Sequence, residues 1–81
     1  MDNKILEARL RGMRKEIKST IQISEDLQEY YSSIAYEDAQ VLSFYGLEVE
    51  EAMGHTEKLI VAARAALADI DKRIDIFGEG P

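Results

Sequence analysis

A regular apolar repeat in the second half of the chain constrains the fold more than any other feature. Nine positions alternate spacings of four and three, and all but one are apolar: Val49, Met53, Thr56, Ile60, Ala63, Leu67, Ile70, Ile74 and Phe77. This heptad spacing places the nine side chains on one side of an α-helix. Leu59 and Ala66 widen that side, as in a helix of a bundle. The pattern predicts a helix over about residues 47–77 whose apolar stripe is hidden from water.

The first half of the chain shows a similar but interrupted repeat. Its apolar members are Leu6, Leu10, Met13 and Ile17, followed by Leu27, Tyr31, Ile34, Val41 and Tyr45. Thr20, Ser24 and Asp38 occupy the same repeat and are polar. Ser24 followed by Glu25 and Asp26 is typical of a helix start, because serine caps the first backbone N–H groups and acids favour the first turn.

Two all-α arrangements fit these patterns. The preferred one is an antiparallel helical hairpin, with a long bent first helix (about 3–44) packed on a second helix (about 47–77). At 1.5 Å per residue the first helix is about 60 Å long and the second about 46 Å, so the overhang predicts an oligomeric bundle. The alternative is a monomeric three-helix bundle with helices at 3–19, 24–44 and 56–77.

Glycines mark the expected boundaries. Phe44-Tyr45-Gly46-Leu47 is the clearest turn signal, since glycine tolerates the left-handed conformation that ends a helix. Gly54 would kink the second helix or restart it with Thr56 as N-cap, and Gly78 with Gly80 would end it.

The length of 81 residues permits one domain with a small core, which self-association would help to stabilise. The chain has no cysteine and one histidine, which excludes disulfide frameworks and the usual zinc clusters. It has no apolar run long enough to span a bilayer and no apolar signal core, so we expect a cytoplasmic protein.

The net charge of −6 conceals a strong segregation along the chain. Residues 1–18 carry six basic and three acidic side chains, whereas residues 19–57 contain nine acidic residues and no Lys or Arg. An acidic chain is a poor candidate for nucleic-acid binding, because affinity for phosphates comes mainly from Lys and Arg. The acidic segment suits either a basic protein partner or the basic arm of a second copy.

Five of the six aromatic residues lie inside the acidic segment. Tyrosine beside carboxylates makes a recognition surface for a basic partner, since it buries a large area with little loss of rotamer freedom. The predicted partner-binding residues are Tyr30, Tyr36, Glu37, Phe44, Tyr45, Glu48, Glu50 and Glu51. The predicted self-association residues are Leu6, Leu10, Met13, Ile17, Ile60, Leu67, Ile70 and Ile74.

No residue pattern indicates catalysis. The acids do not form the two facing pairs that bind Mg²⁺ in nucleotide-hydrolysing bundles, and calcium-loop spacing is absent. His55 has no group to activate nearby in sequence. We therefore expect a non-enzymatic adaptor, chaperone-like protein or inhibitor that works without a cofactor, a metal, a nucleic acid or a membrane.

Two resemblances suggest alternative roles. The triplet Phe44-Tyr45-Gly46 resembles the aromatic-any-Gly turn of the WXG100 family of small secreted helical hairpins, whose members pair as four-helix bundles. The tryptophan of that triplet is replaced here by Phe44, and the family's tyrosine-plus-acid export signal is missing after Phe77. The chain is also similar to small acidic phage proteins that inhibit host nucleic-acid-binding proteins by imitating DNA charge, with residues 19–57 as the mimic.

Overall fold

The computed structural model describes residues 3–79, with side chains described for residues 3–77, and most of this part is helical. The helices are α1 (Asn3–Ser32), α2 (Tyr36–Phe44) and α3 (Val49–Glu79). No strand occurs between residues 3 and 79. The predicted all-α class is therefore confirmed.

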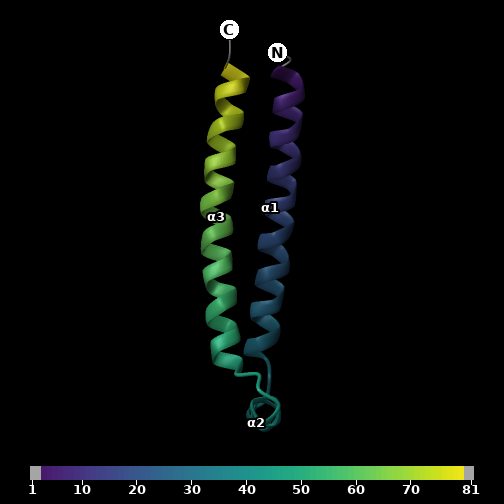
Figure 1. Ribbon diagram of the computed structural model, residues 1–81, viewed down its shortest axis with the longest axis vertical. Coiled ribbons are helices and arrows are strands. Elements are labelled where there is room, and N and C mark those ends of the chain that lie inside the picture. The colour runs from purple at the N-terminus through teal and green to yellow at the C-terminus, as the bar shows by residue number, and fades with distance from the viewer. Residues whose placement is uncertain (1–2, 80–81) are drawn as a thin grey trace.

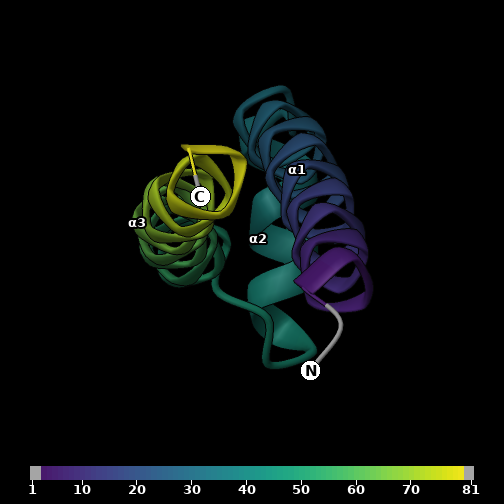
Figure 2. The ribbon, with the colours of Figure 1, turned by 90° about the horizontal axis from the view of Figure 1, so that it is seen from above.

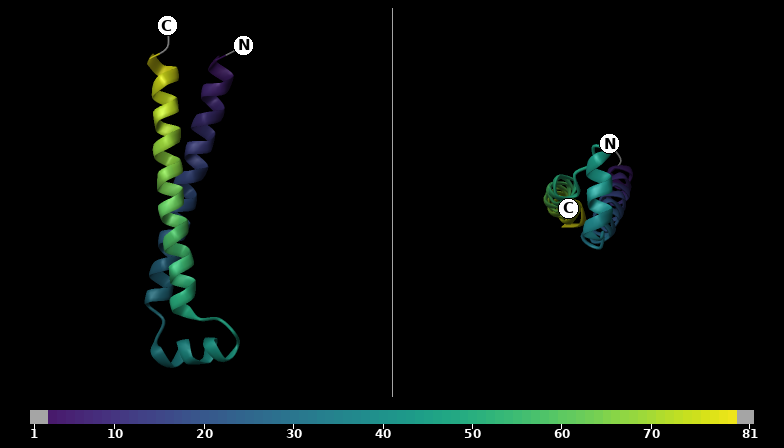
Figure 3. Two further views of the ribbon diagram at one scale, coloured as in Figure 1. Left: turned by 60° about the vertical axis from the view of Figure 1, so that its left-hand side comes forward. Right: turned by 90° about the horizontal axis from the view of Figure 1, so that it is seen from below.

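Helices α1 and α3 lie side by side and run in opposite directions, forming a rod with extents of 60 × 17 × 16 Å (Figure 1). The short helix α2 lies across one end of the rod (Figures 2 and 3). Helix α1 has 30 residues and α3 has 31, so the two are nearly equal in length. The expected overhang is thus wrong, because α1 ends twelve residues before position 44.

The apolar stripe of α3 faces α1 as predicted. Ala63 and Ile74 are buried, Thr56 is buried with 6% of its surface exposed, and the other six stripe positions are half-buried. The Thr56 hydroxyl donates a hydrogen bond to the Ala52 carbonyl at 2.9 Å, which satisfies the one polar member inside the helix. The helix also continues through Gly54, so Thr56 is not an N-cap. Gly80, the second predicted stop residue, lies outside the described residues.

The stripe of α1 is rotated from its predicted position. Alternate members, Leu10, Ile17, Ser24 and Tyr31, do face α3. Between them, however, the inward positions are occupied by Arg14, Ile21 and Gln28.

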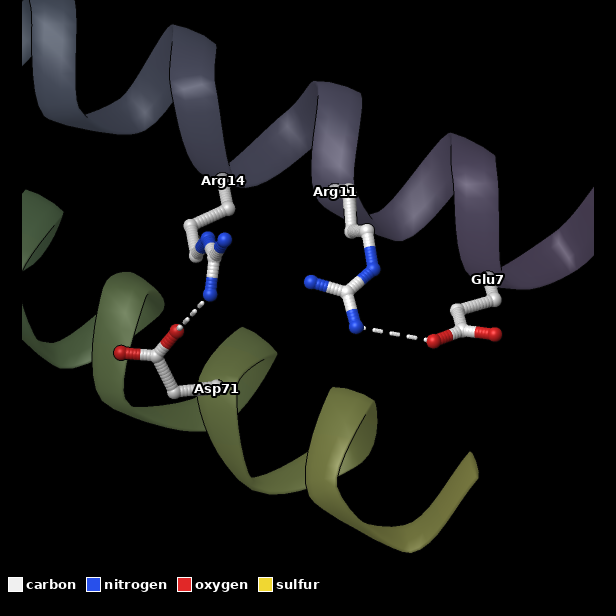
Figure 4. A network of polar contacts seen from close by, with 4 residues as sticks. All are labelled: Glu7, Arg11, Arg14 and Asp71. Carbon is white, nitrogen blue, oxygen red and sulfur yellow. Dashed lines mark hydrogen bonds and ion pairs between the residues drawn. The ribbon is translucent and has the colours of Figure 1, made fainter. Parts of the chain in front are cut away.

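The predicted inward residues Met13 and Leu27 are instead 52% and 40% exposed, and Thr20 is exposed as well. The apolar surface of α1 is broader than one helix can cover. Helix α3 covers the side of α1 on which α1 also has polar side chains that can pair with α3. On that side Arg14 points toward Asp71 of α3 at 3.6 Å, while Arg11 points along α1 to Glu7 at 2.9 Å (Figure 4).

The first half of the chain breaks at residues 33–35, and this corrects both predicted arrangements. The hydroxyl groups of Ser32 and Ser33 donate to the carbonyl groups of Glu29 and Tyr30 at 2.9 and 2.7 Å, which competes with continuation of the helix. Ala35 then takes an extended conformation before α2. The predicted N-cap at Ser24 is wrong, since Ser24 is buried in the middle of α1 with 3% of its surface exposed.

Beyond this break the predicted stripe does not continue. Val41 is 56% exposed and Tyr45 is 80% exposed, whereas Ile34 is half-buried. The stripe is lost because α2 turns across the rod instead of extending α1 (Figure 3).

The rod has a very thin core. Among the described residues, Ala63 and Ile74 are the buried hydrophobic side chains, and no large side chain is completely buried. The accessible surface is 6425 Å², against about 4,900 Å² expected for a monomer of this mass. None of the helices in the described part of the chain is long and apolar enough to cross a membrane.

Candidate protein-binding site at the tip of the rod

We call the end of the rod formed by residues 36–51 the tip. Helix α2 begins with Glu37 and Asp38 in its first turn, where negative charge is favoured by the helix dipole. It ends at Phe44, and Gly46 two residues later has a φ of +92°, which confirms the predicted turn. The Leu47 N–H donates to the Leu42 carbonyl at 2.9 Å and fastens the turn to the helix. Among the described helices α2 contacts α3 alone, so most of its surface faces water.

The tip exposes a cluster of large apolar side chains. Tyr36, Phe44 and Tyr45 are 77%, 84% and 80% exposed. The rings of Phe44 and Tyr45 meet edge to face with centroids 5.3 Å apart, so each ring is held mainly by the other. Val41 and Leu47 are also exposed and extend the cluster. Exposed apolar clusters of this kind are typical of interaction surfaces, which makes the tip the candidate site.

The acidic residues of the tip have few partners of opposite charge. The Ser43 hydroxyl donates to Glu48 Oε1 at 2.5 Å, and Glu51 lies 3.6 Å from His55. Glu37 and Glu50 form no ion pair with any other residue of the described chain. The tip is therefore an apolar cluster inside an uncompensated negative field.

A shallow groove of about 210 Å³ separates α2 from the start of α3. Tyr36 and Ser43 line one side, and Glu48 and Glu50 line the other. Small-molecule sites usually measure about 300–1,000 Å³, so this groove fits a single long side chain better than a substrate. A lysine side chain would place its methylene groups against Tyr36 and its ammonium near the carboxylates.

The structure brings seven of the eight predicted partner-binding residues together at the tip, which are Tyr36, Glu37, Phe44, Tyr45, Glu48, Glu50 and Glu51. Tyr30 belongs instead to α1, where it is 65% exposed and lies edge-on to Tyr31 at 6.3 Å. Sequence reasoning missed Val41 and Leu47, because the assumed continuation of α1 made Val41 a core position.

Seven of the eight predicted self-association residues lie in the contact between α1 and α3, which are Leu6, Leu10, Ile17, Ile60, Leu67, Ile70 and Ile74. Ile74 is buried there, whereas the other six are half-buried and keep part of their surface exposed. Met13 is the exception and is exposed.

The other half of the rod is basic. Arg11, Arg14, Lys15 and Lys18 line an open groove of about 490 Å³ on α1. Two of these cations have partners, since Arg11 pairs with Glu7 and Arg14 with Asp71. In the part of the chain that the structure describes, no group of three or more His, Cys, Asp or Glu side chains is placed to hold a metal ion.

Comparison of the chain with known protein families, with curated proteins and with solved structures finds no significant match. The resemblance to the WXG100 family thus has no support from a family match. The Phe44-Tyr45-Gly46 triplet also lies at the end of the additional helix α2, and not at a direct bend between two long helices.

Proposed function

We propose that the chain is a non-enzymatic protein–protein interaction module that self-associates and binds a basic protein partner through its tip. One observation carries the proposal: three aromatic rings, each at least 77% exposed, stand on α2 and its C-cap among acids, in a segment (residues 19–57) that contains no Lys or Arg. Exposed rings supply apolar contact area, and the carboxylates select a positively charged partner.

The expected partner presents lysine or arginine beside apolar side chains. The groove between α2 and α3 receives one long basic side chain, with Glu50 at its rim. Phe44 and Tyr45 then cover an apolar residue of the partner, because they are the most exposed rings of the cluster. The carboxylates speed the encounter and the rings hold the complex.

The test is a nuclear magnetic resonance titration of the labelled chain with a peptide of alternating lysine and leucine. We expect shifts confined to α2 and the first turn of α3, and none with a matching peptide of glutamate and leucine. The double variant Phe44→Ser and Tyr45→Ser should weaken binding at least about tenfold, because buried aromatic anchors dominate such contacts. Val61→Ser is the matched control, since Val61 is 64% exposed on α3 outside the tip.

Shifts spread over the whole rod, or equal binding by the serine variants and the wild type, would contradict the tip as the site. Charge mimicry gives a different pattern. In that case the Phe44→Ser and Tyr45→Ser variant binds normally, whereas Glu50→Gln and Glu51→Gln abolish binding and raised salt removes it.

A further inference from the structure

One side of the rod carries rows of apolar or small side chains that the contact between α1 and α3 leaves largely exposed, next to the charged residues Arg9, Glu16, Asp69 and Arg73. One row on α1 repeats every seven residues, and each member comes one position before a residue that faces α3. The row consists of Leu6, Met13, Thr20 and Leu27. On α3, Leu59, Ala62 and Ala66 likewise precede the inward residues Ile60, Ala63 and Leu67. Leu59 is 50% exposed, and Ala62 and Ala66 are exposed as well.

These two sets lie on the same side of the rod. Glu25 and Arg64 each follow an inward residue by one position, and their side chains meet at 2.7 Å on one side of the contact between α1 and α3. In antiparallel helices, positions that follow the inward residues share one face, and positions that precede them share the opposite face. We call the second set, Leu6, Met13, Thr20, Leu27, Leu59, Ala62 and Ala66, the apolar face.

The apolar face explains why the predicted apolar stripe of α1 does not point directly at α3. The inward positions of α1 include Arg14, Ser24 and Gln28, whereas Met13 and Leu27 point outside the pair. Part of the apolar surface of α1 is therefore aimed away from α3. The excess of accessible surface over a typical monomer agrees with a missing covering layer.

We propose that a second copy of the chain covers the apolar face and runs in the opposite direction. The side of the rod that carries the apolar face is 60 Å long and 17 Å wide and projects about 1,000 Å², enough for the roughly 800 Å² per partner of a standard interface. This inference rests on the self-association part of the proposed function and adds the surface and the orientation.

Charge fixes the orientation. The part of the rod at the open end, residues 3–18 and 69–79, holds eight basic and six acidic residues, a charge of +2. The part at the tip, residues 19–68, holds two basic and nine acidic residues, a charge of −7. Parallel copies would place −7 beside −7, whereas antiparallel copies place +2 beside −7. At a Debye length of about 8–10 Å, touching halves interact far more strongly than distant ones.

The apolar stripe of α1 suits this symmetry. A twofold axis that reverses the rod and keeps the apolar faces together places α1 of one copy against α1 of the second. The small side chains Ala62 and Ala66 let the two α3 helices approach closely.

Distance measurement between spin labels tests the arrangement without disturbing the apolar face. The chain has no cysteine, so Gln40→Cys at the tip and Ser19→Cys near the middle of α1 each give one label per copy. The antiparallel pair predicts a separation near 60 Å for the label at residue 40 and a short one for the label at residue 19. Short distances at both sites would indicate parallel copies and overturn the orientation, while self-association would stand.

Light scattering over a dilution series tests the surface. Leu27→Glu should weaken the dimer at least about 100-fold, since it buries an unpaired charge, and Val61→Glu on the outer side of α3 should leave the dimer intact. Equal effects of both variants would overturn the apolar face as the contact. A single 9 kDa species at every concentration would overturn self-association altogether, whereas binding of the lysine-rich peptide to the tip would be unaffected.

Discussion

Two isoleucines near the end of α3 allow the contribution of core burial to stability to be distinguished from the contribution of helix propensity. Ile74 is 4% exposed, whereas Ile76, two positions further on, is 60% exposed. Replacing either one with alanine removes the same carbon atoms and slightly improves helix propensity. Burial of three carbon groups at about 0.8 kcal/mol each gives a loss of about 2.4 kcal/mol for Ile74→Ala, before any cavity term. Ile76→Ala should stay within about 0.5 kcal/mol of the wild type.

Urea unfolding followed by circular dichroism at 222 nm measures the difference, with all proteins at one concentration because dimer formation shifts the midpoint. With a slope of about 1 kcal/mol/M, the Ile74→Ala midpoint should fall by about 2.4 M. A domain of 81 residues has about 4–12 kcal/mol of stability, so this variant loses a large part of it. Equal midpoints for the two alanine variants would refute the assignment of Ile74 to the α1–α3 contact.

The remaining predictions use the same unfolding assay. Gln28 Oε1 is buried without a hydrogen-bond partner, so Gln28→Met should raise stability by about 1 kcal/mol, and a lower midpoint would show that the amide has a partner in solution. Gly54→Ala should add about 0.8–1 kcal/mol, because the added Cβ meets no atom within 4 Å in a helix interior. Gly46→Ala should instead cost about 1–2 kcal/mol, because its φ of +92° strains any residue with a side chain, and shifts of the same sign at both glycines would contradict this.

The sequence predicted the inward side of α3 correctly and that of α1 only in part, and the reason lies in how their apolar residues are distributed. The nine positions of the α3 stripe contain one polar residue, so this stripe stands out as the side of α3 that contacts α1. Helix α1 carries two adjacent apolar rows, and periodicity alone cannot show which row meets α3 and which stays outside. Pairs such as Arg14 with Asp71 decide between the rows, and they depend on the register of two segments far apart in sequence.

The sequence contains a local signal for the break after Ser32, but the capping pattern at Ser24 was given more weight. Ser32 and Ser33 are adjacent hydroxyl residues that bond to the preceding turn, whereas the predicted break near Ser24 rested on a capping pattern. Burial of Ser24 against α3 overrides that pattern, since tertiary packing supplies most helix stability in a protein. The tip residues were found because acids and aromatics concentrate there in the sequence, but their mutual placement needed the turn of α2.

The direction of α1 and α3 has a practical consequence for how the protein is handled. Asn3 and the last turn of α3 lie at the same extremity of the rod, while α2 occupies the other extremity about 60 Å away (Figure 1). A purification tag or sensor surface attached at the open end therefore lies far from the aromatic helix of the same copy. In the proposed antiparallel dimer it lies near the aromatic helix of the second copy, so attachment there would obstruct one tip while leaving the other free.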